Sequence, residues 1–207
     1  MEGLFITVEG GEGAGKSTQM ELIADWLAAQ GRNVVRTREP GGTQLAETLR
    51  EILLDKRNAS LSSLTELLLM FASRAQHLDE LIRPALQRGD TVLCDRFTDA
   101  TWAYQGGGRG LPSSEIAALE QLVHGDLQPD LTLLLDLPVE EGMGRAARRG
   151  ESDRFERESL PFFERVRTAY LDRASAEPGR FAVIDAAGDV HAVWQQIQKI
   201  LQGRVKK

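Results

Sequence analysis

Cysteine and histidine are scarce in this chain of 207 residues, which contains one Cys and three His. A single Cys excludes an internal disulfide and a zinc site built on several cysteines. The three His show no metal-binding spacing, and we assign them no role. No apolar run approaches the roughly 20 residues that span a bilayer, and the first residues lack the pattern of a signal peptide. We therefore expect a cytoplasmic protein that does not act at a membrane.

Positive charge is also in deficit. The chain has 25 Lys and Arg against 31 Asp and Glu, which gives a net charge of −6. This balance argues against nucleic-acid binding through an overall positive field. The length and the 42% hydrophobic content fit one soluble domain over residues 1–207, because a chain of this size buries a core without disulfides or metals.

Short apolar segments alternate with segments of helical periodicity along the whole chain. The predicted strands are residues 4–8, 33–37, 91–94, 131–137 and 181–184. Ser63 with Glu66 three residues later is a capping-box signal for the helix that runs through Phe71. Strands that alternate with helices predict an α/β fold with a five-stranded parallel sheet flanked by helices.

A phosphate-binding motif follows the first predicted strand. Residues 10–17 read G-G-E-G-A-G-K-S, which satisfies the pattern G-x-x-x-x-G-K-S/T. Glycines let successive backbone N–H groups turn toward phosphate oxygens, and the start of the next helix adds favourable partial charge. Lys16 supplies a cation for the β- and γ-phosphates, and the Ser17 hydroxyl can ligate Mg²⁺. The predicted ATP-binding residues of this P-loop (10–18) are Gly10, Gly11, Glu12, Gly13, Ala14, Gly15, Lys16, Ser17 and Thr18.

The P-loop alone leaves the reaction open. A GTPase switch needs a guanine-reading N-K-x-D, and the chain has none. The D-x-x-G match at residues 185–188 follows the last strand and lies far from the P-loop in sequence. A kinase for a small acceptor fits the length better than an ATPase motor does. A regulatory nucleotide-binding module without turnover is the alternative from another class.

Further motifs lie at the ends of predicted strands, where open α/β sheets bind ligands. R-E-P-G-G starts at Arg38, D-R-F starts at Asp95, and A-Y-Q-G-G-G-R-G starts at Ala103. Together with L-L-L-M-F-A-S-R-A-Q-H at 67–77 and an Arg-rich segment that ends in D-R-F-E, they resemble the bacterial thymidylate kinase family over nearly the whole chain. The resemblance implies a P-loop kinase fold and a homodimer. It also implies transfer of the γ-phosphoryl group of MgATP to dTMP, which gives dTDP and ADP for dTTP synthesis. A kinase for another nucleoside monophosphate is the alternative.

The implied reaction needs cations more than a general base. A phosphate monoester has a second pKa of about 6, so the acceptor is mostly dianionic at neutral pH. The enzyme must hold two anions together and stabilise the charge of the transferring group. The predicted catalytic residues are Lys16, Arg96, Glu12, Arg149 and Arg154. For Mg²⁺ we predict Ser17 and Asp95, with Asp136 as a second strand-terminal Asp that leaves the role open.

Arg149 and Arg154 belong to the Arg-rich segment, which resembles a small mobile lid at approximately residues 142–156. The P-loop holds no Arg at its variable positions, so a cation for the transition state must come from elsewhere, and the lid is the predicted donor. Arg148 is the next candidate. Taken alone, such an Arg cluster is typical of a solvated helix face.

We predict eight residues around dTMP. They are Glu39, Arg50, Phe71, Arg74, Arg96, Thr101, Tyr104 and Gln105. The resemblance implies six of them, and Thr101 and Gln105, four residues apart, could present a hydroxyl and an amide to the pyrimidine edge. Arg50 is expected at the phosphate, Tyr104 at the sugar 2′ position, and Arg74 at the base. The resemblance also implies that Phe71 stacks on thymine. Phe71 and Arg74 are three residues apart and share one helix face, so both can reach the same base.

Several of these residues have plainer interpretations. Phe71 continues an apolar helical stripe, which is typical of core packing. Arg96 can form a surface salt bridge with Asp95, and Glu39 can pair with a neighbouring arginine such as Arg38.

Overall fold

The computed structural model describes residues 3–58, 60–148 and 154–205. Within these residues, five parallel strands form one sheet in the order β2-β3-β1-β4-β5. The strands are β1 (Leu4–Gly10), β2 (Val34–Arg38), β3 (Thr91–Asp95), β4 (Leu131–Asp136) and β5 (Phe181–Asp185). The register pairs Val8 with Asp95 and Gly10 with Leu135. The carboxyl ends of the three central strands therefore meet at one edge, and the predicted parallel sheet is confirmed.

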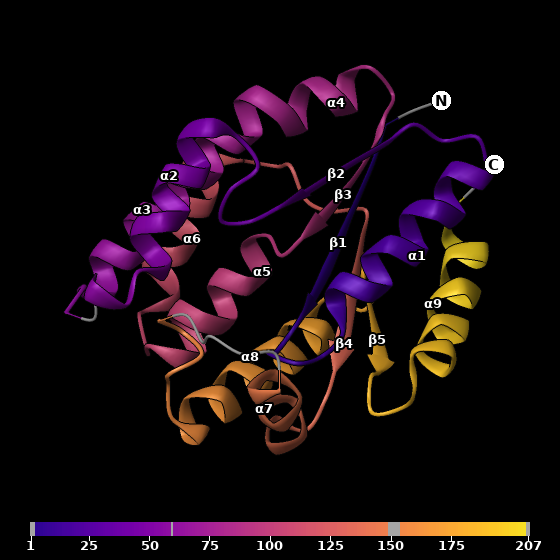
Figure 1. Cartoon of the computed structure of the whole chain (residues 1–207). Coiled ribbons are helices and arrows are strands. Elements are labelled where there is room, and N and C mark those ends of the chain that lie inside the picture. Colours follow the sequence, from indigo (N-terminus) through magenta and orange to yellow (C-terminus); the bar gives the residue numbers. More distant parts are fainter. Residues whose placement is uncertain (1–2, 59, 149–153, 206–207) are drawn as a thin grey trace.

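The two faces of the sheet carry different helices because side chains alternate along each strand. Ile6 and Val8 point to the face covered by α1 (Lys16–Ala29) and α9 (Val190–Arg204), which lie side by side in Figure 1. Phe5 points to the other face and packs with residues before and within α4 (Arg83–Gln87). That second face is also covered by α5 (Thr98–Thr101) and α8 (Leu160–Ala176).

Seven further helices complete the described part of the chain. They are α2 (Gln44–Leu54), η1 (Lys56–Asn58), α3 (Ser63–His77), η2 (Leu78–Ile82), η3 (Trp102–Gly108), α6 (Ser113–Val123) and α7 (Val139–Ala147). Helix α2 packs on α3, and α3 packs on α6. The N-cap of α3 is Ser62, whose hydroxyl accepts from the N–H of Thr65 at 3.2 Å, one residue before the predicted capping residue.

Two further expectations concern membrane-spanning helices and the lid. No helix among the described residues is long and apolar enough to cross a membrane. The predicted lid begins inside α7 and continues past its end at Ala147, so the expectation for Arg149 lies outside the described residues.

Candidate functional site

The P-loop joins β1 to α1 and packs directly against α7. Gly13 and Gly15 have φ angles of 72° and 85°, a conformation that residues with a Cβ rarely adopt. A Cβ on Gly13 would overlap the backbone carbonyl of Gly142, and a Cβ on Gly142 would overlap the carbonyl of Glu12. The two backbones therefore approach each other closely, and glycine is required on both sides of this contact.

Lys16 folds back over the P-loop. Its Nζ donates to the carbonyl oxygens of Gly10 and Gly11, each at 3.0 Å. Burial lowers the pKa of Lys16, and nearby Arg96 lowers it further. An ammonium group that is held by backbone carbonyls at a loop mouth can exchange them for phosphate oxygens.

Arg96 reaches the P-loop from the end of β3. Its Nη2 lies 2.5 Å from Glu12 Oε1 and donates to the Tyr104 hydroxyl at 2.9 Å. The Tyr104 hydroxyl also donates to Glu12 Oε1 at 3.0 Å. Burial alone would raise the pKa of Glu12, but Arg96 and Lys16 outweigh burial and lower that pKa to about 2. The salt bridge considered for Arg96 is thus formed with Glu12 instead of Asp95, and the Arg96 Nε is buried with no partner among the described residues.

The backbone at Arg96 is strained and is held from β1. Arg96 has a φ of 67°, in the left-handed region that favours glycine. The next N–H, that of Phe97, donates to Glu9 Oε1 at 2.7 Å, and the Tyr170 hydroxyl donates to Glu9 Oε2 at 2.7 Å. Burial, and then the Asp99 carboxylate, raise the pKa of Glu9 from 4.5 to about 8. Sequence reasoning did not single out Glu9, which directly follows the predicted strand of residues 4–8.

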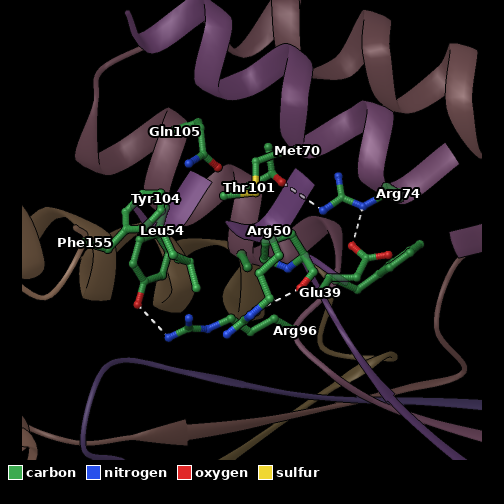
Figure 2. A pocket seen from close by; sticks show the side chains of 13 residues that line it. Glu39, Arg50, Leu54, Met70, Arg74, Arg96, Thr101, Tyr104, Gln105 and Phe155 are labelled. Atoms are coloured by element: carbon green, nitrogen blue, oxygen red, sulfur yellow. Dashed lines mark hydrogen bonds and ion pairs between the residues drawn. The ribbon is translucent and has the colours of Figure 1, made fainter. Parts of the chain in front are cut away.

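A pocket beside the P-loop gathers most of the residues predicted for dTMP, and Figure 2 shows it from close by. It is lined by Glu39, Pro40, Arg50, Leu54, Met70, Arg74, Arg96, Phe97, Ala100, Thr101, Tyr104, Gln105 and Phe155. Every predicted acceptor residue except Phe71 is among them. Arg50 donates to the carbonyl of Pro40 at 2.8 Å, which holds its guanidinium beside the R-E-P-G-G turn.

Arg74 is fixed inside this pocket by two partners and keeps one donor unused. Its Nε donates to Glu39 Oε2 at 2.7 Å, and its Nη2 donates to the Thr101 hydroxyl at 3.0 Å. Glu39 also contacts His77 Nδ1 at 3.0 Å, so it pairs with α3 and not with the neighbouring arginines. The third nitrogen, Arg74 Nη1, is buried and has no partner among the described residues. A buried N–H without an acceptor is costly, and a ligand acceptor would satisfy it.

Phe71, which was predicted to stack on thymine, is not among the residues that line this pocket. It is 2% exposed and packs with Leu67 and Ile116, while the guanidinium of Arg74 lies 4.8 Å from its ring centre. Met70, one position earlier on α3, lines the pocket in its place. Successive residues on a helix point about 100° apart, so one position decides which side chain faces the ligand.

The structure separates the two strand-terminal aspartates. Asp95 lines a cavity together with Ser17, and Asp95 Oδ1 is buried with no partner among the described residues. Both oxygens of Asp136 are instead taken by Arg167, at 2.7 and 2.8 Å. Within the described residues, no cluster of three or more His, Cys, Asp or Glu could hold a metal by itself. A hydroxyl and a carboxylate oxygen nevertheless suit Mg²⁺, which usually keeps several waters and binds phosphate oxygens as well.

Two of the candidate arginines in the predicted lid, Arg148 and Arg154, lie among the described residues. Arg154 is 7% exposed, and its Nε donates to the Leu53 carbonyl at 2.8 Å while its Nη2 donates to Glu66 at 2.7 Å. These partners tie Arg154 to the end of α2 and to α3, and they satisfy donors of a buried guanidinium. Arg148 is exposed at the end of α7.

Proteins that are similar to this chain in sequence and in fold are described as thymidylate kinases. The model of the family "Thymidylate kinase" matches residues 8–197. The chain is 62% identical to a thymidylate kinase of Pseudomonas syringae pv. tomato, over 97% of this chain and 96% of the relative. It is 56% identical to one of Alcanivorax borkumensis, over 98% and 97% of the two chains. The crystal structure of thymidylate kinase from Ehrlichia chaffeensis matches with a TM-score of 0.80 and 37% identity, over 98% of this chain and 100% of that chain. The chain belongs to the thymidylate kinase family.

Proposed function

We propose that this chain transfers the γ-phosphoryl group of MgATP to dTMP and releases dTDP and ADP. The observation that carries the proposal is the position of Arg96 between two sites. Its guanidinium contacts Glu12 in the P-loop and also lines the pocket that holds Arg74 and Gln105. A cation at the border of a triphosphate site and a second nucleotide-sized pocket can screen the repulsion between donor and acceptor phosphates.

The acceptor pocket has the donors and acceptors that a thymine edge requires. Arg74 Nη1 is a buried donor without a partner among the described residues, and it suits the O4 oxygen of thymine. Met70 and Leu54 supply apolar surface beside it. Arg50 supplies a cation beside the R-E-P-G-G turn, where its guanidinium could bind the acceptor phosphate.

Mg²⁺ is proposed as the cofactor, bound with ATP. Ser17 and Asp95 would hold it, directly or through water, since both line one cavity and Asp95 Oδ1 lacks a partner among the described residues. When bound, the ion would neutralise charge on the β- and γ-phosphate oxygens.

The chain's own cations account for the remaining charge. Lys16 would leave the carbonyls of Gly10 and Gly11 for the β- and γ-phosphates. Arg96 would turn from Glu12 toward the transferring group, because a triphosphate carries more negative charge than one carboxylate. Glu12 keeps Arg96 near the P-loop before phosphate arrives, and its low pKa of about 2 keeps it ionised at neutral pH.

We also propose that the protein is a cytoplasmic homodimer. Leu64 and Leu68 on α3 are 51% and 49% exposed, and Leu122 on the adjacent α6 is 79% exposed. Exposed leucines on two packed helices are typical of a surface that another protein covers. Sedimentation analysis that finds only a monomer at micromolar concentration would remove this part of the proposal.

A coupled assay of ADP release tests the activity. We would compare dTMP, dUMP, UMP, dCMP, AMP, GMP and no acceptor, each with MgATP. Strong dependence on dTMP, with weaker use of dUMP, is the expected result. Preference for another monophosphate would overturn the acceptor assignment, and hydrolysis without any acceptor would favour a nucleotide-binding module that is not a kinase.

A further inference from the structure

Glu66 is a fully buried carboxylate in the first turn of α3. It is 0% exposed and does not line the acceptor pocket. The capping role suggested by its sequence position is not what buries it, since Ser62 caps the helix. A buried carboxylate is stable only when donors surround it, so the partners of Glu66 decide its effect on the molecule.

Three side chains donate to Glu66 and occupy both of its oxygens. Gln105 Nε2 donates to Oε1 at 2.8 Å, and Arg154 Nη2 donates to Oε2 at 2.7 Å. Arg109 spans both oxygens, with Nε and Nη2 each at 3.2 Å. These contacts come from η3 and from the segment before α8, so the carboxylate cannot rotate without losing several donors.

This arrangement determines which end of the Gln105 amide meets Glu66. A carboxylate oxygen only accepts hydrogen bonds, and the amide NH₂ is the only donor of a Gln side chain. Turning the amide over would set its carbonyl oxygen against the Glu66 carboxylate and leave a buried acceptor unsatisfied. The amide nitrogen therefore stays on Glu66, and the carbonyl oxygen is the end that remains for the pocket.

Gln105 therefore offers its carbonyl oxygen to the same pocket as the Arg74 guanidinium. Gln105 and Thr101 both line the acceptor pocket, four residues apart, and Figure 2 shows the amide oxygen of Gln105 on the side of Thr101. Arg74 supplies the unpartnered donor Nη1 at the same pocket. The pocket thus presents the Nη1 donor of Arg74, which an ion pair with Glu39 holds in place. It also presents the carbonyl oxygen of Gln105, whose orientation is set by the hydrogen bond to Glu66.

Resting on the proposed function, we infer that Glu66 is a positioning residue that makes the pocket select pyrimidines carrying N3–H. Thymine and uracil present an O4 acceptor and an N3–H donor, which match Arg74 and the Gln105 carbonyl oxygen. Cytosine presents an amino donor and a bare N3 acceptor at the same places. Both of its groups would face a like partner, and such unpaired or repulsive contacts are an effective means of rejection.

The test compares kcat/KM for dTMP, dUMP and dCMP in the wild-type protein and in E66Q. Gln at position 66 can donate as well as accept, so the Gln105 amide becomes free to turn over. We expect the ratio of kcat/KM for dTMP to that for dCMP to fall at least about tenfold. The ratio for dTMP to dUMP should stay within about twofold, because these two bases share the same edge.

Three further variants complete the experiment. E158Q is the matched control, since Glu158 binds Arg109 at 2.5 Å but does not touch Gln105, and its ratios should not change. E66D keeps the negative charge but shortens the side chain, which weakens the hold of the carboxylate on the Gln105 amide. It replaces E66Q if circular dichroism shows that E66Q is unfolded. Q105L removes the amide altogether and gives the largest change in the ratio of dTMP to dCMP that loss of the amide can cause.

Two results would overturn the inference. One is an unchanged ratio of dTMP to dCMP in the folded Glu66 variant, with all three substrates affected alike, which would leave Glu66 a purely structural role. The other is an unchanged ratio in Q105L, which would mean that the amide does not read the base. A wild-type protein that does not phosphorylate dTMP would instead overturn the proposed function before any variant is compared.

Discussion

The buried carboxyl of Glu9 should make the stability of this protein depend on pH in a defined way. Burial and the Asp99 carboxylate raise its pKa from 4.5 to about 8, so the folded state holds this proton more tightly than the unfolded chain does. The resulting stabilisation is complete below pH 4.5 and is lost as the pH rises to about 8. A change of this size corresponds to about 5 kcal/mol, since a tenfold change in proton affinity is about 1.4 kcal/mol.

Replacing Glu9 by Gln removes the titration and keeps both hydrogen bonds. The Gln carbonyl can accept from the Phe97 N–H, and its amide can donate to the Tyr170 hydroxyl. Between pH 4.5 and pH 8, the free energy of unfolding of E9Q should therefore rise relative to that of the wild type by about 5 kcal/mol.

Urea unfolding of both proteins at several pH values measures this difference. E115Q, which changes an exposed carboxylate on α6, is the control and should follow the wild type. A relative change of less than about 1 kcal/mol over this range would refute the reasoning, because Glu9 would then be no harder to ionise in the fold than in the unfolded chain.

Three other predictions concern the site. Arg96→Ala should remain folded by circular dichroism while kcat falls about 100-fold or more, and a kcat near wild type would exclude Arg96 from the reaction. Met70→Ala should raise KM for dTMP more than Phe71→Ala does, whereas Phe71→Ala should lower the free energy of unfolding by about 3–5 kcal/mol; a larger KM effect at Phe71 would return the base to that ring. Asp95→Asn should raise the Mg²⁺ concentration for half-maximal activity and Asp136→Asn should not; the opposite pattern would exchange their roles.

The sheet could be predicted from the sequence because its central strands are buried on both faces. Strands β1, β3 and β4 carry almost no exposed position, so they read as short continuous apolar runs between helical segments. The P-loop could also be predicted from the sequence, since its residue types follow from the chemistry of phosphate binding. The order of the strands was not predicted, because periodicity reports burial and says nothing of which strand lies beside which.

The motifs did not predict ion pairs between residues that lie far apart in sequence. Glu39 pairs with Arg74 and His77 across more than 30 residues, while the sequence offered Arg38 as the nearer cation. Tertiary packing of α3 on the R-E-P-G-G turn decides this pairing. His77 was assigned no role because the three His show no metal-binding spacing, although it follows Arg74 by three positions and so shares its helix face.

The structure lines the acceptor pocket with Met70 and not with Phe71, the residue that the resemblance suggested for the base. Both are large apolar residues on α3, and the amphipathic pattern tolerates either of them on the buried side. The family resemblance was confirmed, but it was applied to an aromatic residue one position from the side chain that lines the pocket. A resemblance transfers the fold more securely than it transfers the orientation of single side chains.

The close backbone contact between Gly13 and Gly142 has a consequence for the thermodynamics of nucleotide binding. Because α7 already fixes the P-loop, ATP does not have to organise the loop in order to bind. The conformational entropy of that segment is lost when the chain folds, and it does not reduce affinity when phosphate arrives. The same contact restricts substitutions in the loop, since the loop backbone cannot shift without moving α7. Differences in nucleotide affinity among variants of this protein should therefore originate mainly in residues that surround the loop.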